Sequence, residues 1–202
     1  NENGEAYTKV NHVPLSSSHL GIVAEVNELS REISAGRVKL EEAEERLEKI
    51  EKIPPKKRWF QYMAAGLASG TFALMLGSSV LEAVAAFLIG FLSYVWVLFA
   101  GKHNLSKIIV NIVGGVIMTV LALAFMHIPF LPILKLDGMM VGAIMPMIPG
   151  VAFVNAIRDI ADTDFLSGLV RMIDALLVFV YIAIGVGVTL SIYNTMMGGI
   201  LR

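Results

Sequence analysis

The sequence predicts an all-α, polytopic helical membrane protein with five transmembrane helices preceded by a cytoplasmic helical hairpin. Two observations support this fold class. Of the 202 residues, 56% are hydrophobic and only 16% are charged, whereas soluble domains carry about 25% charged residues. The charge is also uneven, because residues 1–58 hold 21 of the 33 charged side chains. The chain therefore divides into a soluble region, residues 1–58, and an apolar domain, residues 59–202.

Five runs in the apolar domain contain no Asp, Glu, Lys or Arg. A helix needs about 20 apolar residues to cross the hydrocarbon of a bilayer, and these runs have 19 to 27 residues. Buried helices of a soluble protein are the alternative, which five successive runs of this length disfavour. The five spans, which would lie in a lipid bilayer, are predicted within residues 59–81, 83–101, 108–134, 138–157 and 175–201.

Basic residues next to these runs predict the orientation, since cytoplasmic loops are enriched in Lys and Arg. Eight basic residues lie on the side of the N-terminal region, and only Lys135 and Arg202 lie on the other side. We therefore expect a cytoplasmic N-terminus and an external C-terminus. The eight are Lys52, Lys56, Lys57, Arg58, Lys102, Lys107, Arg158 and Arg171.

Two amphipathic helices are predicted in the soluble region, over residues 18–36 and 40–53, with Ser18 as a cap, Gly36 as a stop and Pro54-Pro55 as the end. Their charges are interpreted as a solvated face, and residues 7–13 show the alternation of a short strand. The apolar positions are Leu20, Val23, Val26, Leu29 and Ile33, then Leu40, Ala43, Leu47 and Ile50. The favourable i,i+4 pairs are Glu42/Arg46, Glu45/Lys49 and Glu48/Lys52.

The stretch Met145-Pro146-Met147-Ile148-Pro149-Gly150 lies at the centre of the fourth run. Each proline removes a helical N–H and so frees the carbonyl four residues earlier, at Gly142 and at Met145. Irregular backbone in hydrocarbon is tolerated only where protein or water satisfies its polar groups, and transporters place binding sites at such breaks. Two interpretations remain: a broken helix that binds substrate, or a single kinked packing helix.

Polar residues follow this stretch directly. Asn155 and Asp159 are i,i+4 neighbours on a continuing helix, with Arg158 one step round. Arg158 is suited to a substrate carboxylate through its planar guanidinium, and Asp159 to an ammonium group or a proton. A structural clamp formed by Arg158 and Asp159 at the end of the helix is the alternative. Asp174 is the acid closest to the fifth run and, with Asp159, is a candidate for proton or ion coupling.

Other features are interpreted as structural. Glu82 and Asp137, at the external ends of two spans, are able to load a proton, but such interfacial carboxylates are expected to be simply solvated. Glycines permit close helix contacts in three runs. They are Gly66 and Gly70, Gly114 and Gly115, and Gly185 and Gly187.

The sequence also excludes classes of function. It contains no Cys, no H-E-x-x-H, no G-x-S-x-G and no phosphate-binding loop, so neither an enzyme nor a metal site nor a cofactor is expected. No part of the chain is basic enough to follow a phosphate backbone, which disfavours nucleic acid as a partner.

The sequence resembles the N-terminal portion of the bacterial threonine/serine exporter family. The matching segments run through nearly the whole chain, and the double-proline stretch with the residues after it is the most specific. They are Val26-Asn27-Glu28-Leu29-Ser30-Arg31-Glu32-Ile33, Leu40-Glu41-Glu42-Ala43, Pro54-Pro55, Met145-Pro146-Met147-Ile148-Pro149-Gly150, Asn155-Ala156-Ile157-Arg158-Asp159 and Ser167-Gly168-Leu169-Val170-Arg171.

The resemblance implies a multi-pass exporter of small hydroxy amino acids in the bacterial cytoplasmic (inner) membrane, driven by ion gradients. It also implies a second, smaller membrane subunit as a partner, because this chain lacks the family's second set of spans. The chain is expected to begin inside the family's soluble domain. A homo-oligomer is compatible with the sequence.

The sequence is consistent with three functions. The leading hypothesis is a subunit of a secondary-active exporter of threonine or serine, with the broken fourth span forming the pathway. Export of small dicarboxylates is an alternative, since related two-subunit members are associated with it. A non-transporting scaffold, which recruits a soluble protein through its cytoplasmic hairpin, is the alternative from another class.

Overall fold

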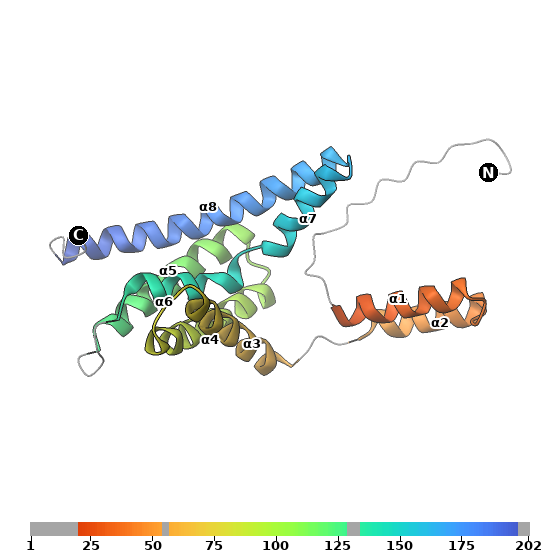
Figure 1. Ribbon diagram of the computed structural model, residues 1–202, viewed down its shortest axis with the longest axis horizontal. Helices are drawn as coiled ribbons and strands as arrows, with labels where there is room; N and C mark the ends of the chain where they lie inside the picture. Colours follow the sequence, from red (N-terminus) through yellow and green to blue (C-terminus); the bar gives the residue numbers. More distant parts are fainter. Residues whose placement is uncertain (1–19, 54–56, 129–133, 198–202) are drawn as a thin grey trace. The chain divides into compact units, whose positions relative to one another are not determined.

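The computed structural model describes residues 20–53, 57–128 and 134–197, which form eight α-helices and one 3₁₀ turn with no strand among them (Figure 1). The short strand expected at residues 7–13 and the cap Ser18 lie outside the described residues. The chain divides into two compact units, Asn1–Lys56 and Lys57–Arg202.

The first unit contains helices α1 (Leu20–Ser34) and α2 (Leu40–Glu51). Gly36 ends α1 with a φ of +66°, a left-handed conformation that glycine adopts without steric cost. The two helices pack through Leu29, Ala43 and Ile50, which are all less than 9% exposed. Each predicted helix is therefore present, and both end within two residues of the expected stops.

Ion pairs cover the outside of these helices. The three predicted pairs are confirmed, with N–O distances of 3.3 Å (Glu42–Arg46), 2.7 Å (Glu45–Lys49) and 3.6 Å (Glu48–Lys52). The hydrogen bond and the charge of Lys49 lower the pKa of Glu45. Arg46 also bonds Glu32 of α1 at 2.6 Å, which the sequence pattern did not predict. The apolar stripe is only partly covered: Val23, Val26, Ile33 and Leu47 are 39–51% exposed.

Two large aliphatic side chains of α2, Ile50 and Leu47, test which contacts stabilise this helix pair. Ile50→Ala removes a buried contact and is expected to destabilise the pair by about 2 kcal/mol or more, whereas Leu47→Ala removes a half-exposed side chain and should have little effect. Amide hydrogen exchange over residues 20–53 of the full chain measures both. Equal loss of protection in the two variants would contradict this packing.

The second unit holds the apolar helices. They are α3 (Arg58–Met75), α4 (Val80–Lys102), α5 (Lys107–Met126), α6 (Leu136–Ile144), the 3₁₀ turn η1 (Met145–Met147), α7 (Gly150–Ala161) and α8 (Phe165–Met196). Three of them, α4, α5 and α8, are long and apolar enough to cross a membrane, and α6–η1 with α7 passes the same test as one bent pair. Among the described residues, the candidate spans therefore number three or four.

The five predicted spans exceed the three or four candidate spans among the described residues. The difference lies in α3, whose first turn contains Arg58 and Gln61 and so lowers its mean hydropathy. Helix α3 is nevertheless packed closely on α4: a methyl group added at Gly66 or Gly70 would lie within 3.0 Å of a Phe87 or Ala83 carbonyl oxygen. Five spans remain a prediction.

Small residues allow close packing elsewhere in this unit. A methyl group at Gly115 of α5 would lie 2.7 Å from the Ile182 carbonyl oxygen of α8, and one at Gly185 would lie 2.1 Å from that of Ile112. Gly187 meets nothing within 4 Å and has no packing role among the described residues. The main core lies between α4, α5 and α6. Its buried residues are Ala85, Ile89, Met118, Ala122, Leu134, Met139, Met140 and Ala143.

Candidate functional site

The helix of the fourth run is interrupted at its centre. Helix α6 ends at Ile144, the turn η1 follows, and α7 begins at Gly150 with its axis bent by 61°. Ile148 is extended, with φ −67° and ψ 127°, as the steric effect of the following proline favours. Met145 precedes Pro146 but stays helical, with φ −51° and ψ −43°. The break therefore comes from Pro149 rather than from Pro146.

The carbonyls that the prolines were expected to free are both bonded. Met145 N–H donates to the Gly142 carbonyl, and Ile148 N–H donates to the Met145 carbonyl at 3.2 Å. The reason is that the chain tightens into i→i+3 bonds, which satisfy the groups that an α-helix would leave open. The expectation of two free carbonyls was wrong. Gly150 also has open space around it, so close packing does not require glycine there.

The start of α7 is the polar feature that the break does create. Pro149 occupies the N-cap and no side chain caps the helix. The Gly150 N–H donates to the Ile148 carbonyl at 2.8 Å, and the helix terminus carries a positive partial charge. The break lies among helices: the Met147 side chain would meet a methyl added at Gly114 of α5, and Phe153 contacts Phe179 of α8 with ring centroids 6.2 Å apart.

The three polar residues Asn155, Arg158 and Asp159 do not form one cluster. Asn155 and Arg158 are exposed on α7, and Arg158 lies 3.7 Å from Asp162, one turn further along. Asp159 instead faces α8, where its Oδ2 lies 3.1 Å from Nη1 of Arg171. The two groups form an ion pair but no hydrogen bond, because Oδ2 of Asp159 has no hydrogen-bond partner. The clamp expected between Arg158 and Asp159 is therefore wrong.

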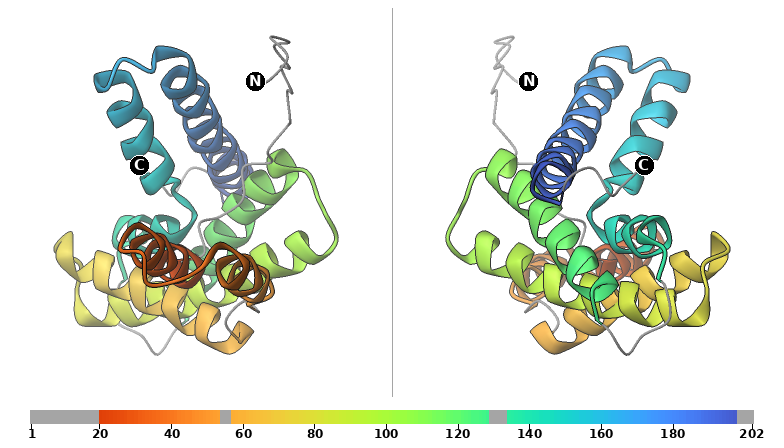
Figure 2. Two further views of the ribbon diagram at one scale, coloured as in Figure 1. Left: turned by 90° about the vertical axis from the view of Figure 1, so that its right-hand side faces the viewer. Right: turned by 90° about the vertical axis from the view of Figure 1, so that its left-hand side faces the viewer.

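A second ion pair connects neighbouring helices. Asp174 of α8 lies 2.5 Å from Nζ of Lys107, the first residue of α5. With Asp159–Arg171, this pair ties α5 and α7 to the same part of α8. Figures 1 and 2 show α8 lying beside α5. They also show α7 as an antiparallel neighbour of α8, joined to it by a short turn. The structure thus separates Asp159 and Asp174 into two pairs and adds Lys107 and Arg171 to the candidates.

Glu82 was expected to be solvated, and this was wrong. It is 5% exposed and is the only buried charged residue in the described part of the chain. Ser79 and Glu82 form a capping box at the start of α4, and the other carboxylate oxygen accepts the Lys135 N–H at 2.8 Å. The capping-box spacing Ser-x-x-Glu is visible in the sequence and was the signal to use.

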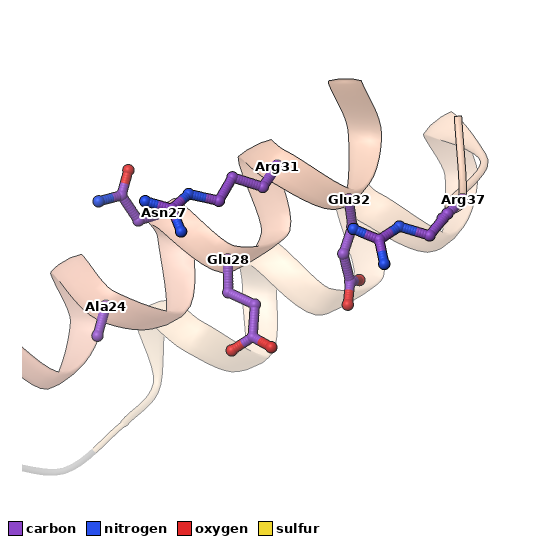
Figure 3. Close-up of a pocket in the computed structure, with 6 residues that line it drawn as sticks. All are labelled: Ala24, Asn27, Glu28, Arg31, Glu32 and Arg37. Carbon is purple, nitrogen blue, oxygen red and sulfur yellow. The ribbon is translucent and has the colours of Figure 1, made fainter. Parts of the chain in front are cut away.

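The first unit offers a different kind of surface. A cavity of about 440 Å³ on α1 is lined by Asn27, Arg31 and Arg37 together with Glu28 and Glu32 (Figure 3). These charges are of both signs and lie along an open helix face, which is typical of a solvated surface. No group of three or more His, Cys, Asp or Glu side chains suited to a metal ion occurs among the described residues.

Comparison with known families decides the classification. The family model described as a threonine/serine exporter matches residues 1–193. The chain belongs to the threonine/serine exporter family. This is a transporter family, which agrees with membrane-compatible helices in the second unit. No curated protein and no solved structure matches the chain.

Proposed function

We propose that this member of the threonine/serine exporter family is a subunit of a secondary-active exporter of threonine and serine across the bacterial cytoplasmic membrane. The observation that carries the proposal is the break before α7, where a helix N-terminus without a side-chain cap interrupts a candidate membrane span. Such a terminus attracts a carboxylate, which every amino acid carries. The second, smaller membrane subunit is expected to complete the pathway.

The ion pairs Asp159–Arg171 and Lys107–Asp174 are proposed as the gate on the side with the basic residues. The Oδ2 of Asp159 that faces Arg171 is itself buried. Arg171, Lys107 and Asp174 have side-chain exposures of 33–50%, so water and a charged substrate are able to compete for these three groups. Arg158 and Asn155, exposed one turn away, are proposed to meet a substrate that has passed the gate. Asp159 and Asp174 then serve also as candidates for ion coupling.

Transport by the complete complex tests this function. The chain and its partner subunit, purified together and reconstituted in proteoliposomes, are expected to exchange labelled threonine or serine and to respond to an imposed ion gradient. Labelled succinate in the same vesicles tests the alternative of dicarboxylate export. Absence of threonine and serine flux in vesicles that carry the intact complex would overturn the proposal.

The two prolines are expected to contribute unequally. Pro149→Ala removes the restraint that keeps Ile148 extended, so α6 and α7 should become more continuous and transport should fall severalfold. Pro146→Ala alters a residue beside a helical Met145 and should change the rate much less. The threonine flux of the two variants measures this difference.

The same assay separates an exporter from a scaffold. Deletion of residues 1–53 would abolish the role of a scaffold but should leave threonine flux detectable. Tolerance of alanine at both prolines, combined with loss of cellular function on deletion of residues 1–53, would instead favour the scaffold.

A further inference from the structure

The buried carboxylate of Glu82 joins two segments that are distant in the sequence. Its Oε2 accepts the Ser79 N–H at 2.7 Å within the α3–α4 connection, and its Oε1 accepts the Lys135 N–H at 2.8 Å just before α6. Both bonds are donated to the carboxylate, so both depend on acceptor oxygens. Helix α6 in turn leads directly into the break at η1.

The space around Glu82 is built for this contact and is open to water. Ser78, Ser79, Glu82, Lys135 and Gly138 line a cavity of about 690 Å³. Gly138 lets α6 approach closely, because a methyl group there would lie 2.6 Å from Ser78 Oγ and 3.1 Å from Glu82 Oε2. A proton therefore has access to a carboxylate whose side chain is otherwise enclosed.

We propose that Glu82 is a positioning residue and a proton-binding site: its ionised carboxylate holds the start of α6 against α4, and protonation releases it. A protonated carboxyl group has one oxygen that carries a hydrogen and accepts poorly, so it cannot keep both N–H bonds equally well. Loss of the Lys135 bond frees the outer end of α6. Only the role of this contact in transport rests on the proposed function.

The neighbouring charges do not replace this switch. Among the described residues, Lys135 is the one charged group whose charge acts on Glu82, and no ion pair joins their side chains. Asp137, in the first turn of α6, is exposed. The α3 side, residues 76–79, contributes no titratable side chain, and His127 at the end of α5 bonds Tyr193 of α8 instead.

Amide hydrogen exchange tests the proposal in the full chain. It is read at the Lys135 N–H, which donates to Glu82, and over the first turn of α6. Protection at each pH is calculated relative to the intrinsic exchange rate at that pH and is normalised to the protection in the middle of α5, which lies in the core.

The normalised protection is expected to fall severalfold as the pH is lowered from 7 to 3. Adding Glu82→Gln should leave it low and independent of pH, whereas adding Asp137→Asn should leave the pH profile unchanged. A flat profile with Glu82 present, or a profile that persists in Glu82→Gln, would overturn the proposal. The pH profile needs no change at Glu82, so it decides the matter even where that variant folds poorly, and neither outcome depends on transport.

Discussion

Asp159→Asn is expected to lower the rate of threonine transport by about fivefold or more, because it removes the charge that holds α7 to Arg171 of α8. A partly exposed ion pair contributes on the order of 1 kcal/mol, which corresponds to about a fivefold shift in a two-state equilibrium. Arg171→Ala should shift the gate in the same direction. Initial rates of labelled threonine flux in proteoliposomes measure both variants.

Asp162→Asn is the matched control for this experiment. Asp162 lies on the same turn of the chain, but its partner Arg158 is 79% exposed, so its loss should alter transport less than twofold by the low value of surface pairs. The exchange Asp159→Arg with Arg171→Asp should restore part of the rate. Unchanged transport in Asp159→Asn and in Arg158→Ala would remove these residues from the proposed site.

Gly185→Ala should destabilise the second unit strongly, while Gly187→Ala should not. The added methyl group at Gly185 meets the Ile112 carbonyl oxygen at 2.1 Å, and this atom belongs to a helix backbone that cannot move alone. Overpacking of this kind costs about 1–3 kcal/mol. At Gly187 nothing lies within 4 Å, and alanine favours helix by about 1 kcal/mol relative to glycine.

Thermal unfolding of the full chain in detergent compares these two glycines directly. The melting temperature should drop for Gly185→Ala and stay equal or rise for Gly187→Ala. Similar melting temperatures for the two variants would contradict the packing of α5 on α8.

Local patterns predicted the helical elements well. The charge-free runs gave the approximate position of every apolar helix, and Gly36 marked the end of α1. The prolines predicted an interruption of the fourth run, but the sequence could not say which proline was responsible. That depends on the backbone angles of Met145 and Ile148, which packing around η1 selects from those that each residue allows.

Contacts between distant segments were beyond the sequence pattern. Lys107 and Asp174 are 67 residues apart, and their pairing requires α5 and α8 to lie side by side. The same limitation applies to Glu82, whose partner Lys135 is 53 residues away. In the sequence, Asp174 is the natural partner of Arg171, because the two are i,i+3 neighbours on one helix. In the structure Arg171 instead pairs with α7 and Asp174 with α5. Only the arrangement of the helices selects between such partners.

The length of α8 places the proposed gate at the edge of the lipid. With 32 residues the helix rises about 48 Å, whereas the hydrocarbon is about 30 Å thick. Even at a tilt of 40° it would span about 37 Å, so one end must emerge into water. Arg171 and Asp174 identify that end. The ion pairs with Asp159 and Lys107 are therefore exposed to dissolved salt, and their hold on the helices should weaken as ionic strength rises.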